Sequence, residues 1–96
     1  MNKRMMKGKN NMINNIIMLE NNKSYVILDE TILDKKKYYF GLRVNDNDEP
    51  MNSYLFFVEK KENNRIFLIP INNKNTKGLL LTAFTFNFLD KVYDEV

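Results

Sequence analysis

Three short runs of aromatic and β-branched residues, separated by polar linkers, occupy the middle of the sequence. The runs cover residues 37–44, 53–59 and 65–71, and the linkers cover residues 45–50 and 60–64. Runs of this composition, bounded by Asn, Asp and Pro, are typical of β-strands joined by turns. The pattern therefore predicts three consecutive antiparallel strands around which the rest of the chain is organised.

Two further apolar runs precede this central stretch. The first run covers residues 13–19 and is followed by the pair Asn21-Asn22. The second run covers residues 24–29. Asn tolerates the left-handed backbone conformation that tight hairpin turns need, so these two runs are predicted to form a hairpin. Ile32 and Leu33 follow, and residues 34–36 are predicted to turn into the central stretch. The expected sheet is an antiparallel β-meander of about five strands.

Side chains of a strand alternate between two faces, which assigns the residues of the first central run. Tyr38, Phe40, Leu42 and Val44 are expected on one face, and Tyr39, Gly41 and Arg43 on the other. Gly41 indicates either a close approach by a neighbouring group or a bulge. Residues 65–71 are apolar on both faces, so this strand is either covered twice or meets a partner. Pro70 cannot donate to a ladder and is expected at the end of the strand.

The C-terminal stretch permits two interpretations. We expect Thr76-Lys77-Gly78 to end a loop, after which residues 79–96 run on without Gly or Pro. Thr82, Phe84, Phe86 and Phe88 alternate as a strand would, whereas Leu81, Phe84, Phe88 and Val92 form a helical stripe. We favour a helix packed on one sheet face, because the second apolar face would otherwise have no cover. A strand over residues 79–88 followed by one helical turn is the alternative. The predicted fold class is α+β, mainly a β-meander with one C-terminal helix.

Charge is distributed unevenly along the chain. Lys3, Arg4, Lys7 and Lys9 precede the first acidic residue, and the remaining 11 basic and 12 acidic residues give a net charge of −1. We therefore divide the chain into a flexible basic leader, residues 1–12, and one small β-rich domain, residues 13–96. The leader is either a solvated tail or an arm that contacts phosphates. A domain so close to neutral argues against a large nucleic-acid-binding face.

The absence of Cys and His limits the chemistry available to this chain. It excludes disulfides, thiolate nucleophiles and the usual zinc sites, and it removes the side chain best suited to proton transfer near neutral pH. The acidic cluster at residues 45–49 lacks the spacing of a calcium loop, since Met51 and Phe57 stand where Gly and Glu are needed. We expect no enzyme, no cofactor, no metal and no small-molecule substrate. The apolar clusters are shorter than a membrane span, and a cytoplasmic location fits the missing cysteines.

From residue 15 onward, the chain resembles a family of small uncharacterised proteins from low-GC Gram-positive bacteria and their phages, a domain of unknown function. The residues that carry the resemblance are 15–30, 36–40, 56–60 and 65–68. The resemblance implies a leading hairpin, a β-meander and an acidic helical tail. The chain departs from the family pattern in its basic leader and in residues 79–88, where the family has a charged helix. No activity is implied.

These observations favour a small, non-catalytic, protein-binding protein. The expected interface is the unexplained apolar surface of the third central run and the C-terminal stretch, namely Phe67, Ile69, Ile71, Phe84, Phe86 and Phe88. The partner would be a second copy of the chain or a host complex, the latter making the protein a phage or mobile-element inhibitor of host defence and an anti-CRISPR candidate. The alternative is a nucleic-acid-binding protein that uses Lys3, Arg4, Lys7, Lys9, Lys36 and Tyr38.

Overall fold

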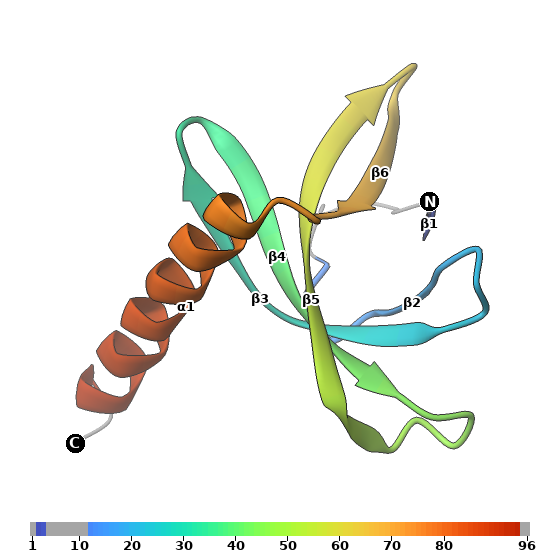
Figure 1. The fold of residues 1–96 in the computed structure, drawn as a ribbon, viewed down its shortest axis with the longest axis horizontal. Helices are drawn as coiled ribbons and strands as arrows, with labels where there is room; N and C mark the ends of the chain where they lie inside the picture. The colour runs from blue at the N-terminus through green and yellow to red at the C-terminus, as the bar shows by residue number, and fades with distance from the viewer. Residues whose placement is uncertain (1, 4–11, 95–96) are drawn as a thin grey trace.

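A computed structural model describes residues 2–3 and 12–94 of the chain, and it confirms the predicted α+β class (Figure 1). The elements are β1 (Asn2–Lys3), β2 (Ile16–Met18), β3 (Ser24–Leu33), β4 (Lys36–Val44), β5 (Pro50–Glu62), β6 (Arg65–Pro70) and α1 (Lys74–Asp94). Strands β2 to β6 form the predicted five-strand antiparallel meander, and the short β1 adds to β6, giving the order β1-β6-β5-β4-β3-β2. The sheet curls into a half-barrel, and α1 follows it.

Two of the hairpins are tighter, and their strands longer, than the sequence predicts. Asp34 and Lys35 both have positive φ, as do Asn63 and Asn64, so each hairpin turns within two residues. The predicted linker at residues 60–64 was too long, because β5 continues through Glu62. The prediction for residues 24–29 was too short, because β3 continues to Leu33. Pro70 ends β6, as expected.

The inner face of the curled sheet holds the larger core. Its buried side chains come from the segment before β2, from strands β2 to β6 and from the connection between β2 and β3: Met12, Ile17, Leu19, Tyr25, Ile27, Tyr39, Phe57 and Leu68. The Tyr25 and Phe57 rings meet edge to face with centroids 5.8 Å apart, a geometry that aromatic pairs prefer. Curling brings strands distant in the sheet around one cluster, so a short chain obtains a closed core without a second sheet.

Gly41 lies in the middle of β4, where the predicted close approach occurs. A Cβ atom added at this position would lie 2.7 Å from Cε2 of Phe57. Since non-bonded carbons settle at about 3.5–4.0 Å, no larger residue fits without moving the Phe57 ring. The glycine therefore lets a fully buried aromatic side chain lie directly over the β4 backbone.

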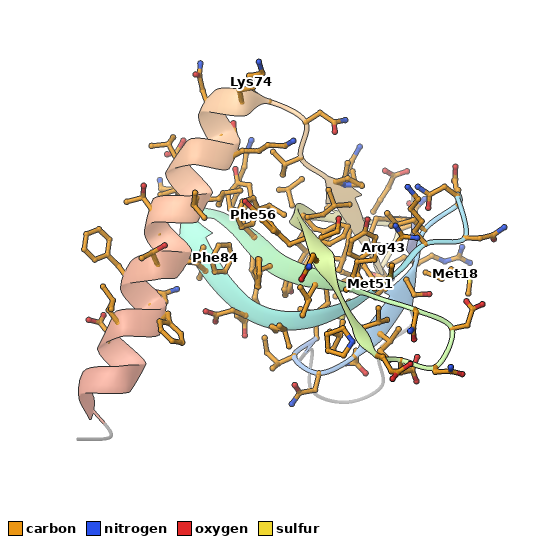
Figure 2. The ribbon with its side chains drawn as sticks, turned by 60° about the horizontal axis from the view of Figure 1, so that its bottom comes forward. Met18, Arg43, Met51, Phe56, Lys74 and Phe84 are labelled. Carbon is orange, nitrogen blue, oxygen red and sulfur yellow. The ribbon has the colours of Figure 1, made fainter. Side chains whose placement is uncertain are left out.

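The outer face of the sheet is covered in part by α1, which confirms the preferred helical interpretation of the C-terminal stretch. Leu80 and Phe84 of the helix pack against Tyr38 of β4 and Phe56 of β5. The Phe56 and Phe84 rings are stacked, with centroids 5.5 Å apart and planes within 2° of parallel. Figure 2 shows these two rings between the helix and the sheet. The sheet's second apolar face thus obtains its cover from the helix.

The helix begins earlier than the sequence predicts. Thr76, Lys77 and Gly78 were expected to end a loop, but they belong to the first turns of α1. Asn73 caps the helix: its side-chain oxygen accepts a hydrogen bond from the Thr76 backbone N–H at 3.1 Å, and its carbonyl accepts from Lys77 at 2.9 Å. A strong cap therefore outweighs the low helix propensity of Gly78.

The segment before β2 bears on the predicted division between leader and domain. Met12, assigned to the flexible leader, is 1% exposed and belongs to the inner core. Asn2 and Lys3 pair with Leu68 and Phe67 of β6. The rest of the leader, residues 1 and 4–11, lies outside the described residues.

Substituting Gly41 and Gly78 separates a packing constraint from a helix-propensity effect. We expect Gly41→Ala to lower the free energy of unfolding by about 1–3 kcal/mol, because its methyl group overpacks against Phe57. Gly78→Ala is the matched control, since its Cβ would meet nothing within 4 Å, and it should raise stability by about 0.5–1 kcal/mol. Urea denaturation measures both. Equal effects of the two substitutions would contradict the packing argument.

Candidate interaction surface

Helix α1 is apolar around most of its circumference, which is unusual for a helix at a protein surface. Leu80 and Phe84 are 0% and 7% exposed against the sheet. Five further large apolar side chains of the same helix are between 40% and 63% exposed: Leu79, Leu81, Phe86, Phe88 and Leu89. A surface helix normally carries polar residues opposite its buried side, and a helix that is apolar all round is normally buried. The sheet of one chain covers only one side of α1.

The exposed residues form two stripes, because successive residues of an α-helix are rotated by about 100°. We call Leu81, Thr85 and Phe88 the flank stripe, which lies beside the sheet-facing side. We call Leu79, Thr82, Phe86 and Leu89 the outer stripe, which lies on the side turned away from the sheet.

The threonines of both stripes turn their hydroxyl groups back to the helix. Thr82 Oγ1 donates to the Gly78 carbonyl at 3.1 Å, and Thr85 Oγ1 donates to the Leu81 carbonyl at 2.7 Å. A hydroxyl satisfied by the backbone four residues earlier leaves its donor unavailable to a neighbouring molecule. The two threonines therefore interrupt the apolar character of the stripes less than their residue type suggests.

Beside the flank stripe, the surface between α1 and the outer sheet face is hollowed. One hollow, of about 430 Å³, is lined by Leu28, Asp29, Phe40, Phe56, Leu81, Phe84, Thr85 and Phe88. A second, of about 330 Å³, is lined by Tyr54, Leu55, Phe56, Lys77, Gly78 and Leu81. Both include Phe56 and Leu81, so they form neighbouring parts of one groove along the helix.

The six residues predicted for partner binding are distributed between surface and core. Phe86 and Phe88 are exposed on α1, whereas Phe84 is buried in the contact between helix and sheet. Phe67, Ile69 and Ile71 are half-buried, and Ile71 packs against the cluster of the outer sheet face. Leu79 and Leu81 lie within the predicted apolar surface of residues 79–88 but were not named as site residues, and Leu89 was missed. The 3-4-3 spacing of residues 79, 82, 86 and 89 within a predicted helix could have identified the outer stripe.

The aromatic residue named for the alternative interpretation, nucleic-acid binding, is not accessible for base stacking. Tyr38 is 8% exposed and packs against α1, so a base could reach its ring only after the helix moved. Lys36 is exposed at the start of β4. Arg4, Lys7 and Lys9 lie outside the described residues, as does the side chain of Lys3.

A polar cluster stands at the inner face of the sheet. Tyr39, fully buried, donates its hydroxyl hydrogen to Glu59 Oε2 at 2.5 Å, and Glu59 also lies 3.7 Å from the Lys61 ammonium. The Lys37 ammonium is 2.7 Å from Glu30 and 5.7 Å from the centre of the Tyr39 ring. Burial, the hydrogen bond to Glu59 and the charge of that carboxylate raise the pKa of Tyr39 far above its ordinary value of 10.0. The phenol thus stays a hydrogen-bond donor at physiological pH and stabilises the core.

A smaller hollow of about 210 Å³ lies near the β4–β5 loop. Its lining includes Lys23, Arg43 and Asp46. Arg43 Nε is buried and has no hydrogen-bond partner among the described residues. In the loop itself, the Asn45 side-chain oxygen accepts backbone hydrogen bonds from Asn47 and Glu49, which orders the turn locally. Because charges of both signs line this hollow, it does not select an anion or a cation.

The Tyr39 hydrogen bond yields a pH-dependent prediction. Tyr39→Phe leaves the Glu59 carboxylate, whose side chain is 9% exposed, without its phenol donor, and should lower stability by about 1–3 kcal/mol near pH 7. In the unfolded chain Tyr39 ionises near pH 10, whereas in the folded chain its pKa is higher. Its contribution is therefore complete below about pH 10 and is lost as the pH rises further.

Urea denaturation at about pH 8 and about pH 11 measures this loss. The unsubstituted chain should lose more stability between the two pH values than Tyr39→Phe does. Tyr54→Phe is the matched control, because it removes a hydroxyl group from an exposed tyrosine of the same sheet and should change the stability near pH 8 little. An equal loss in the Tyr39→Phe variant and the unsubstituted chain would contradict the assignment.

Comparisons with known proteins give no family for this chain. No protein-family model, no curated protein and no solved structure matches it. The resemblance to a family of uncharacterised bacterial and phage proteins therefore stays a prediction. Within residues 2–3 and 12–94, the structure contains no helix with the length and hydropathy needed to cross a membrane.

Proposed function

We propose that this chain is a protein-binding domain in which α1 is the binding element and the curled sheet is its scaffold. The observation that carries the proposal is the exposure of five large apolar side chains on a helix that already buries Leu80 and Phe84 against the sheet. Full burial of a Leu or Phe side chain contributes about 1.5–3 kcal/mol relative to exposure, so a protein partner that covers these residues gains substantially.

The fold of a single chain does not require the residues of the outer stripe to be apolar. Phe86 is 62% exposed and belongs to neither hydrophobic core of the described residues. A polar residue at this position would keep the contact between helix and sheet and would improve solubility. An aromatic residue there is instead typical of protein interfaces, where aromatic side chains supply much of the binding free energy.

The buried polar groups support a non-catalytic role. The Tyr39–Glu59 pair lies in the inner core and is committed to a mutual hydrogen bond, with Tyr39 held in its neutral form. The apolar groove beside the flank stripe offers Asp29 and Lys77 as its charged lining residues. This combination suits docking of an apolar surface better than a reaction that requires converging polar groups.

The test places a photo-cross-linking benzoylphenylalanine at position 86 of the full chain, in the cells that produce it. We expect a discrete covalent adduct with a protein, because the partner must cover the outer stripe. The matched control carries the same group at position 18, because Met18 is 56% exposed and lies on the side of the molecule opposite α1 (Figure 2). It should give no discrete adduct.

A second variant checks that the adduct depends on the apolar stripe. Leu79→Glu combined with the photo-cross-linker at position 86 should abolish the adduct while leaving the thermal unfolding midpoint of the chain nearly unchanged, since Leu79 is 61% exposed. Absence of any adduct from position 86, or equal adducts from positions 86 and 18, would overturn the proposed function.

A further inference from the structure

Strand β3 extends beyond the strand that covers its far edge, the edge turned away from β4. β2 pairs with residues 24–26 of β3, and Ile27 exchanges backbone hydrogen bonds with Asn14 and Asn15. From there β3 continues to Leu33, and among the described residues only β4 pairs with this part of the strand. We call residues 28–33 the open edge. A row of unpaired backbone groups at a sheet edge is a template for pairing with a strand of another chain.

The hairpin that follows the open edge determines which of its backbone groups lack a partner in β4. The two-residue turn of this hairpin makes Leu33 and Lys36 a hydrogen-bonded pair. In an antiparallel ladder such pairs alternate with pairs that exchange no hydrogen bonds. Ile32 and Glu30 occupy the non-bonded positions of the pairing with β4. Their N–H and C=O groups therefore point away from β4, toward the position that an added strand would take.

The side chain of Asp29 already occupies one of these outward groups. Its Oδ1 atom accepts a hydrogen bond from the Glu30 backbone N–H at 2.8 Å. A strand added to the open edge would need the same N–H for its own ladder, so the carboxylate competes with strand pairing. The register of β3 on β4 also shifts between Ile27 and Asp29, which marks a bulge at the start of the open edge. Bulges and charged side chains are means by which natural sheets keep an edge from pairing.

Without this block, the open edge would be suited to pair with a copy of itself. Leu28 is 40% exposed and Ile32 is 71% exposed, and Thr31 and Ile32 are β-branched residues, which favour strands. When two copies are aligned antiparallel about Thr31, Glu30 of one copy lies level with Ile32 of the other. Both residues point their backbone groups outward, so each such pair can exchange two hydrogen bonds. The carboxylate at the Glu30 N–H removes one donor from each pair.

We infer that Asp29 is an edge-blocking residue, whose carboxylate holds the Glu30 N–H and so keeps the open edge of β3 from pairing with a second copy of the chain. This role gives a reason for a carboxylate in the otherwise apolar lining of the hollow beside the flank stripe. The inference goes beyond the proposed function, because it concerns the edge of the sheet and is independent of the outer stripe of α1.

The test compares two full-length variants that remove the same charge. Asp29→Ala deletes the acceptor, whereas Asp29→Asn keeps a side-chain oxygen that can accept from the Glu30 N–H. In light scattering over a concentration series, the mass of Asp29→Ala should rise above that of the unsubstituted chain, and the mass of Asp29→Asn should match it. In dilute solution, the Glu30 amide hydrogen of Asp29→Ala should exchange roughly tenfold faster than in the unsubstituted chain, because its hydrogen bond to a charged group is lost.

A double variant locates the association at the open edge. Ile32→Pro added to Asp29→Ala removes an N–H that points away from β4, so the ladder with β4 is kept and the mass should return to that of the unsubstituted chain. Association that persists in the double variant, or that is equal in Asp29→Ala and Asp29→Asn, would overturn the inference. So would an Asp29→Ala mass equal to that of the unsubstituted chain at all concentrations. None of these variants alters the outer stripe, so cross-linking from position 86 tests the proposed function separately.

Discussion

A strongly curled sheet has two apolar faces, and the rest of this structure follows from the means by which a short chain covers both. The inner face closes on itself, since curling brings side chains from β2 to β6 around Tyr39 and Phe57. Gly41 permits this closure by leaving room for the Phe57 ring against the backbone. The outer face has no such solution and depends on one helix, which contributes Leu80 and Phe84. The helix thus has a structural role on one side and a free apolar surface on the others.

The strands and turns could be predicted because their signals are local. Asn63-Asn64 and Asp34-Lys35 adopt the left-handed conformation that two-residue hairpins require, and Gly41 marks a close approach. The lengths of β3 and β5 could not be predicted in the same way. The end of β5, residues 60–62, is polar and exposed, and its pairing with β6 holds it as strand. The end of β3 is held in the same way by its pairing with β4. Pairing with a neighbour is a tertiary effect that composition does not show.

The C-terminal stretch shows where local signals conflict. Thr82, Phe84, Thr85 and Phe86 have modest helix propensity, and alternation over these residues favours a strand. The helix forms because its sheet-facing side meets the outer face and because Asn73 caps its first turn. The candidate interaction surface on α1 could be predicted only in part, because local signals do not show which side of the helix meets the sheet. Phe86 and Phe88 could be identified as unexplained apolar residues, whereas the burial of Phe84 follows from the stacking of its ring on Phe56 of the sheet.

The composition of α1 also connects its stability to its occupancy. Toward its C-terminus, Leu89 and Asp90 are exposed, so the end of the helix depends mainly on its own backbone hydrogen bonds. Under the proposed function, a partner that covers the outer stripe would bury Phe86 and Leu89. The same contacts that bind the partner would then stabilise the helix itself. Phe86, which is 62% exposed on the solitary helix, would gain burial from such a partner, so under the proposed function the stability of α1 and its binding would be linked.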